Sequence, residues 1–176
     1  LPPATLAAAR QRLERPAPRV ALGLALRGVA RSAIDLSDGL AGDLPHVLQA
    51  SSQAAGQPLG AELDEQALIG LTAPWAQEAQ EEQEAQPACG KSALDAAARL
   101  QAALAGGDDY ELLFTAAPGA RQAVLAAAAA AQTPVTRAGR VTRAEAAAPA
   151  SIFLRAASGA LRPLPAEARG FDHFAA

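Results

Sequence analysis

Two carboxylates and a hydroxyl lie close together at the first place in this chain where the side chains could do chemistry. Residues 33–40 read AIDLSDGL, so Asp35 and Asp38 are three residues apart with Ser37 between them. Mg²⁺ prefers oxygen ligands and usually takes one or two carboxylates together with substrate phosphates. The pattern is therefore compatible with a magnesium site in which Ser37 donates a hydrogen bond to a phosphate. A tight turn followed by a helix cap explains the same residues without a ligand, and spacing alone leaves both interpretations open.

A second acidic segment follows later in the chain. Residues 106–114 read GGDDYELLF, so a glycine pair precedes the adjacent acids Asp108 and Asp109. Paired glycines end a helix and allow close backbone approach, while adjacent carboxylates repel each other unless they are solvated or share a cation. A ligand-binding loop and a plain helix end with an exposed loop are both consistent with this pattern.

The third candidate is the tail, where residues 170–174 read GFDHF. Phe171 could stack on a heterocycle, or it could simply dock the tail on the body of the domain. His173 has no second histidine near it in sequence. We find no Ser-His-Asp or Cys-His arrangement, so catalysis through an activated nucleophile is not expected.

The bulk composition narrows the class of partner. The net charge is −3 and there is a single lysine, which argues against general binding to nucleic acid or to an acidic membrane surface. Cys89 is the only cysteine, which excludes an internal disulfide and fits a reducing compartment, so we expect the cytoplasm. We expect neither a signal peptide nor a membrane span. Because the chain begins at Leu1, we interpret it as a fragment.

Apolar spacing and turn residues predict an irregular mixture of helices and strands. Helices are expected over 5–13, 39–51, 92–104 and 118–131. Strands are expected over 32–36, 110–114, 135–141 and 151–154, and we expect 151–154 to be the last strand of the chain. We also expect a helical element over 22–30, an edge strand at 61–63 and a solvated insertion over 76–90. This order favours a layered α+β domain over regular βαβ winding.

Taken together and in order, these segments resemble the thiamine-monophosphate kinase family. The resemblance rests on residues 15–19 (RPAPR), 32–40, 106–112 and 170–174, and it covers nearly the whole chain from about residue 15. It implies the carboxy-terminal α+β domain, with three α/β/α layers, of the aminoimidazole ribonucleotide synthetase-like superfamily. Residues 16–176 would form that domain, and residues 1–15 would be a connecting helix from a missing amino-terminal domain.

The resemblance also implies an activity and a set of roles. The family passes the γ-phosphoryl group of ATP to thiamine monophosphate with the help of Mg²⁺, and the full-length protein is expected to be a homodimer. Asp35 and Asp38 would bind Mg²⁺, and Ser37 would contact an ATP phosphate. Asp108 would face thiamine monophosphate, and Phe171 would stack on a ring of thiamine.

The sequence departs from the family in ways that affect activity. The family commonly has Glu where this chain has Asp108, so a contact made there would be one methylene shorter or bridged by water. The family's other Mg²⁺ aspartates lie in the amino-terminal domain, so this chain alone is not expected to complete the reaction. The alternatives are a non-catalytic nucleotide- or partner-binding module of the same fold, and another ATP-using member of the superfamily.

Overall fold

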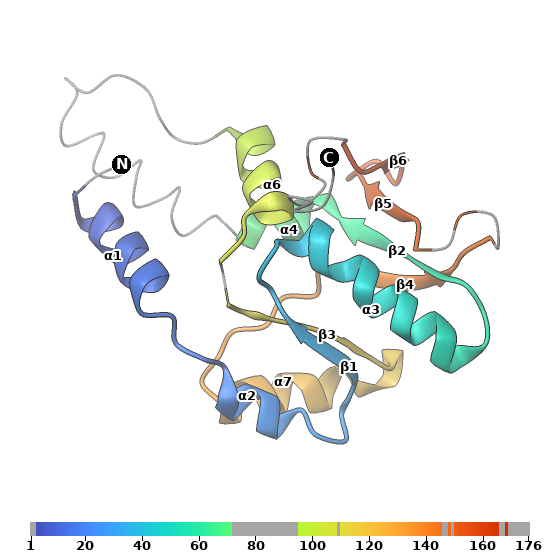
Figure 1. The fold of residues 1–176 in the computed structure, drawn as a ribbon, viewed down its shortest axis with the longest axis horizontal. Coiled ribbons are helices and arrows are strands. Elements are labelled where there is room, and N and C mark those ends of the chain that lie inside the picture. Colours follow the sequence, from blue (N-terminus) through green and yellow to red (C-terminus); the bar gives the residue numbers. More distant parts are fainter. Residues whose placement is uncertain are drawn as a thin grey trace, which may run out of the picture.

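The computed structural model describes residues 3–71, 95–108, 110–145, 148, 150–165 and 168, and Figure 1 shows their arrangement. The helices are α1 (Pro3–Glu14), α2 (Val20–Ala25), α3 (Leu40–Ala55), α4 (Glu65–Leu71), α6 (Ala96–Ala105) and α7 (Arg121–Ala130), with a 3₁₀ turn, η1 (Pro118–Ala120), before α7. The strands are β1 (Ala30–Asp35), β2 (Leu59–Asp64), β3 (Leu112–Ala116), β4 (Gly139–Arg143), β5 (Ile152–Arg155) and β6 (Leu161–Pro163).

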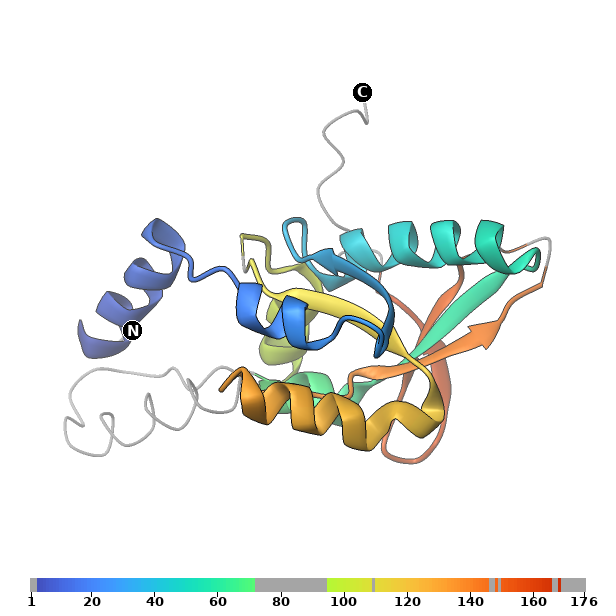
Figure 2. The same cartoon turned by 90° about the horizontal axis from the view of Figure 1, so that it is seen from below.

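The strands form two sheets in a mixed α/β fold. β1 and β3 make an antiparallel pair, and the other strands make a four-stranded sheet in the order β4-β2-β5-β6. Within that sheet β2 runs parallel to β5, and the other pairs are antiparallel. Figure 2 shows α3 along one side of the strands and α7 along the other, while α1 stands apart from the body. In the described part of the chain, no helix has the length and apolar character needed to cross a membrane.

The main core lies between the four-stranded sheet and the helices α3, α4 and α6. α3 has a buried apolar stripe because leucine and valine recur at helical spacing along it. α6 contributes Leu100 and Leu104 to the same core. At the start of this helix, the carboxylate of the N-cap residue Asp95 accepts the N–H of Ala98 at 2.7 Å. The buried residues of this core are Leu40, Ala41, Leu44, Leu48, Ala61, Leu63, Leu68, Leu100, Leu104, Leu154 and Ala168.

A smaller core holds the β1–β3 pair against α2 and α7. Leu22 and Leu26 are buried against Ala127 of α7, and the β3 side chains of Leu112 and Phe114 pack on this cluster. The acidic segments at the end of β1 and before β3 therefore start from strands that are fixed by packing.

Most of the expected elements are present, with specific corrections. The strand expected at 61–63 is β2, but it lies inside its sheet between β4 and β5 and is not an edge strand. The helical element expected over 22–30 ends at Ala25, because the chain turns into β1 at Ala30. Helix α4 and strand β6 were not predicted, so 151–154 is not the last strand, and the strand expected over 135–141 begins only at Gly139. The solvated insertion expected over 76–90 lies outside the described residues.

Candidate functional site

The pairing of β1 with β3 brings the two acidic segments together. Asp35 is the last residue of β1 and pairs with Leu112, the first residue of β3. The end of β1 therefore lies beside the start of β3. Backbone hydrogen bonds then continue past the strands. The Leu36 N–H donates to the Glu111 carbonyl at 2.8 Å, and the Tyr110 N–H donates to the Leu36 carbonyl at 2.9 Å. Residues 36–39, the first acidic loop, and residues 106–111, the second acidic loop, thus form one surface.

Glycines allow the two loops to touch. Gly39 has φ +84°, and a Cβ there would lie 2.9 Å from the carbonyl oxygen of Gly106. A Cβ on Gly107 would lie 2.8 Å from the carbonyl oxygen of Ser37, and that same oxygen accepts the Asp108 N–H at 2.9 Å. The glycines of the second motif therefore allow the two loops to pack closely. The sequence had suggested that they allow close approach to a ligand.

Four of the residues predicted to bind ligands, Asp35, Ser37, Asp38 and Asp108, lie in or next to this surface. Asp35, Asp38 and Asp108 are exposed, and Ser37 is half-buried. Among the described residues, no group of at least three histidine, cysteine, aspartate or glutamate side chains is close enough to hold a metal ion by itself. The arrangement offers separate carboxylate oxygens and a hydroxyl, which suit a cation that completes its coordination with water or with a ligand phosphate.

The second acidic loop has unusual backbone geometry. Asp108 and Tyr110 both lie in the left-handed region, with φ values of +60° and +51°. Such values are uncommon for residues other than glycine and concentrate at functional sites. Tyr110 was predicted to begin the strand over 110–114, but it precedes β3, and it is 40% exposed.

Tyr110 is in direct contact with the predicted substrate residue. Its hydroxyl donates a hydrogen bond to Oδ1 of Asp108 at 3.1 Å. This hydrogen bond and the charge of Asp108 raise the pKa of the Tyr110 hydroxyl, and the negative charge of Asp35 acts in the same direction. Tyr110 is therefore hydrogen-bonded to Asp108 within the second acidic loop.

Glu111 connects the second acidic loop to the RPAPR segment. Its carboxylate accepts two hydrogen bonds from Arg19, from Nε at 2.8 Å and from Nη2 at 2.6 Å. Arg12 of α1 donates a third at 2.7 Å. The hydrogen bonds and charge of Arg19, reinforced by Arg12, lower the pKa of Glu111 against the opposing effect of burial. Two motifs far apart in sequence are thus joined by a geometry typical of strong ion pairs.

Asp43 is a site residue that sequence reasoning missed. It lies in the first turn of α3 and is only 4% exposed, and its Oδ2 accepts the N–H groups of Ser37 and Asp38 at 3.0 and 3.1 Å. The start of a helix is the positive end of its dipole and would favour a phosphate. A carboxylate already occupies two of the nearby N–H groups. The available signal was its spacing, because Asp43 interrupts the apolar stripe formed by Leu40, Leu44 and Val47.

Some of the predicted residues cannot be placed. Phe171 and His173 of the tail, and Asp109 of the second acidic loop, lie outside the described residues.

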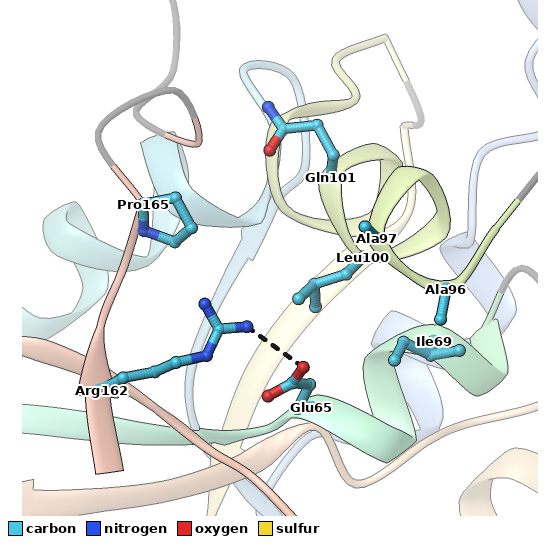
Figure 3. A pocket seen from close by; sticks show the side chains of 8 residues that line it. All are labelled: Glu65, Ile69, Ala96, Ala97, Leu100, Gln101, Arg162 and Pro165. Atoms are coloured by element: carbon cyan, nitrogen blue, oxygen red, sulfur yellow. Dashed lines mark hydrogen bonds and ion pairs between the residues drawn. The ribbon is translucent and has the colours of Figure 1, made fainter.

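A separate hollow of about 410 Å³ lies at the other end of α6 (Figure 3). Its walls come from Glu65, Ile69, Ala96, Ala97, Leu100, Gln101, Arg162 and Pro165. Arg162 points toward Glu65 across the hollow, and their charged groups are 3.1 Å apart. The first half of α6 lines this hollow, whereas the second acidic loop follows the end of that helix, so none of the predicted site residues line it.

Comparison with known proteins connects this geometry to one kind of enzyme. The chain is 35% identical over 161 residues to the thiamine-monophosphate kinase of Escherichia coli K12, covering 92% of this chain and 41% of that protein. It is 40% identical over 112 residues to the thiamine-monophosphate kinase of Haemophilus influenzae, covering 62% of this chain and 26% of that protein. No family model matches the chain.

Solved structures agree with the sequence comparison. The crystal structure of thiamine-monophosphate kinase from Stenotrophomonas maltophilia K279a superposes with a TM-score of 0.61 at 32% identity, covering 86% of this chain and 40% of that one. The structure named tt0281 from Thermus thermophilus gives a TM-score of 0.54 at 28% identity, covering 89% and 40%. The chain spans about 40% of the length of these relatives and matches the carboxy-terminal part of the kinases, as its motifs predicted.

Proposed function

We propose that this chain is the carboxy-terminal part of a kinase that phosphorylates thiamine monophosphate with ATP to give thiamine diphosphate. The observation that carries the proposal is the joining of the two acidic loops by the β1–β3 pair. Two of the motifs by which the sequence resembles these kinases, residues 32–40 and 106–112, thus lie side by side. The likeness to the enzymes from Escherichia coli and Stenotrophomonas maltophilia supports the same function.

The chemistry of the reaction suits this surface. The accepting phosphate is already an anion, so no strong general base is required, and the main obstacle is repulsion between two polyanions. Asp35 and Asp38 present hard oxygen donors that fit Mg²⁺, and Ser37 presents a hydroxyl next to them. When bound, Mg²⁺ neutralises phosphate charge and aligns the reacting groups.

We assign the other roles in the same proposal. Ser37 contacts a phosphate of ATP. Asp108 faces thiamine monophosphate, and one of its oxygens accepts a hydrogen bond from Tyr110. Phe171 stacks on a ring of thiamine, whose thiazolium is a cation that favours an aromatic face.

The proposal includes the wider architecture. Residues 16–176 form the carboxy-terminal domain of three α/β/α layers, and residues 1–15 connect it to an amino-terminal domain. The placement of α3 and α7 on opposite sides of the strands supports this layering (Figure 2). In the full-length protein we expect a homodimer, a cytoplasmic location, and the remaining Mg²⁺ and ATP ligands in the amino-terminal domain.

The test is an assay of thiamine diphosphate formation from ATP and thiamine monophosphate. It is run on the 176-residue chain and on the full-length enzyme that joins this chain to an amino-terminal domain. We expect turnover only in the full-length enzyme, because phosphoryl transfer needs all of the phosphate charge neutralised together. Inactivity of the full-length enzyme would contradict the proposed function, and rapid turnover by the chain alone would contradict the division of the site.

A further inference from the structure

Asp43 places a polar side chain where burial is costly. The residue is 4% exposed and lies on the buried stripe of α3 between Leu40 and Leu44. A polar group removed from water is unfavourable unless hydrogen bonds compensate it. The bonds that Asp43 accepts come from the backbone of the first acidic loop, from Ser37 and Asp38. The buried side chain therefore holds that loop.

The peptide groups around Ser37 are held from two sides. Oδ2 of Asp43 accepts the Ser37 N–H, and the Ser37 carbonyl accepts the Asp108 N–H from the second acidic loop. The following N–H, of Asp38, is held by the same Oδ2, and Gly39 packs against the Gly106 carbonyl. Contacts on both sides thus hold the backbone of Ser37 and Asp38 in place. The backbone in turn sets where their side chains begin.

Asp43 also affects what the loop can bind. Its Oδ2 occupies the N–H groups of Ser37 and Asp38, which a phosphate could otherwise use. The loop is therefore less suited to binding a bare phosphate through its backbone, and the exposed carboxylate of Asp38 is left to bind a cation.

We infer that Asp43 is a positioning residue of the phosphoryl-transfer site, which sets the first acidic loop in the geometry that binds the divalent cation. The inference rests on the proposed kinase function. We assign Asp43 no direct contact with substrate or cation, because it is buried and its Oδ2 accepts from the loop backbone. It acts through the placement of Ser37 and Asp38.

The experiment compares Asp43→Ala and Asp43→Asn in the full-length enzyme. Asp43→Ala removes the acceptor and should lower kcat by roughly 10- to 100-fold and raise the Mg²⁺ concentration needed for half-maximal rate. The KM for thiamine monophosphate should change less than about twofold, since the residues assigned to that substrate are untouched. Asp43→Asn retains an oxygen acceptor and should recover most of the rate.

Amide hydrogen exchange gives a readout that does not depend on activity. The Ser37 and Asp38 amides should exchange at least ~10-fold faster in Asp43→Ala than in the wild-type protein, with Asp43→Asn close to wild type. Calorimetric titration with Mg²⁺ alone should show weaker binding by the alanine variant. The matched control is Asp64→Ala, which removes a carboxylate that accepts the Ala67 N–H at the start of α4. It should alter stability without altering Mg²⁺ dependence.

The possible outcomes separate this inference from the proposed function. If the wild-type enzyme lacks kinase activity, the proposed function fails, and exchange and Mg²⁺ binding still decide the role of Asp43. An alanine variant with wild-type exchange at Ser37 and Asp38 would overturn the inference. A variant whose rate falls only in proportion to its folded fraction, at an unchanged Mg²⁺ requirement, would also overturn it. If Asp43→Ala does not fold, Asp43→Asn decides the question. A folded asparagine variant with wild-type Mg²⁺ affinity supports positioning by the oxygen acceptor. A folded asparagine variant that has lost Mg²⁺ affinity contradicts it.

Discussion

The carboxylates of the four-stranded sheet and those of the acidic loops differ in what neutralises them. Glu62 of β2 accepts hydrogen bonds from Arg140 of β4 and Arg155 of β5, so its charge is balanced by the two neighbouring strands. In the part of the chain that the structure describes, Asp35 and Asp38 form no ion pair with an arginine. Carboxylates of the first kind are paired within the fold, whereas those of the second kind are exposed and open to a ligand.

Glu111 and Asp108 show that carboxylates with and without an arginine partner can occur in one motif. Glu111 is three residues from Asp108, yet it is bound by Arg19 and Arg12, while Asp108 contacts the neutral hydroxyl of Tyr110. The second acidic loop therefore combines a structural carboxylate with one that is available to a ligand. Arginine pairing therefore distinguishes Glu111 from Asp108, the residue that we assign to the substrate.

The largest expected effect is that of Asp38→Asn in the full-length enzyme. The substitution is nearly isosteric and removes one charge from an exposed turn, so the fold should be preserved. Under the proposed function Asp38 binds the cation that neutralises phosphate charge, so turnover should fall by at least ~100-fold. The measurement is the rate at saturating Mg²⁺ together with the melting temperature. We expect the same result, with a somewhat smaller loss, for Asp35→Asn.

A wild-type rate with an unchanged melting temperature would show that Asp38 serves only the turn. The matched control is Glu145→Gln, which removes a carboxylate on the exposed segment after β4. That change should leave both rate and melting temperature as they are, which excludes a general effect of removing one negative charge.

The next effect concerns Glu111→Gln, which should make the protein less stable in a pH-dependent way. At pH 7 we expect the melting temperature to fall by roughly 2–4 °C, because two arginines lose a charged acceptor that is only partly exposed. The folded-state pKa of Glu111 is lowered by Arg19 and Arg12. Its stabilising effect is therefore fully present above the pKa of the unfolded chain, near ~4.3, and is lost as pH falls through the lower folded-state value.

Thermal unfolding of wild-type and Glu111→Gln proteins from pH 7 to pH 3 checks this expectation. The difference in melting temperature should be constant above about pH 5 and should shrink toward the acid end, where the wild-type carboxyl also becomes neutral. A difference that grows on acidification would contradict the assignment of Glu111 as an arginine-paired carboxylate.

Glu62→Gln should have a smaller effect and should act on stability alone. Its partners Arg140 and Arg155 are partly exposed, so salt and water weaken the interaction. We expect a decrease of about 1–2 °C in melting temperature, reduced further at high salt, with turnover unchanged. A loss of turnover comparable to that of Asp38→Asn would break the proposed division between paired and unpaired carboxylates.

The local elements were predictable because their signals are local. The apolar spacing of Leu40, Leu44 and Leu48 predicted α3, and the glycines at 106 and 107 correctly marked the end of α6. The motifs in order predicted the kinase resemblance that the comparisons confirmed. Those patterns depend on neighbours within a few turns of the same chain.

What the sequence did not predict depends on contacts between distant residues. β2 was taken for an edge strand, because a short apolar run does not reveal that β4 and β5 will pair on its two sides. The joining of the two acidic loops required the β1–β3 pairing, and Glu111 acquired its role only through Arg19, 92 residues away. Asp43 was the exception, since a charge on the apolar face of a predicted helix is a local signal.

The smallest expected effect is that of Tyr110→Phe, which tests how finely the second acidic loop is arranged. The change removes only the hydroxyl that donates to Oδ1 of Asp108 at 3.1 Å. Because the side chain is 40% exposed, water can replace part of that bond, and the melting temperature should not change measurably. Asp108 would nevertheless lose the partner that orients it. The apparent affinity for thiamine monophosphate should then weaken by about two- to fivefold, with the affinity for ATP unchanged. Measuring both affinities on one variant decides the point, since Asp108 is assigned to one substrate only. Equal weakening of both would assign Tyr110 to the loop as a whole, and wild-type values for both would remove it from the site.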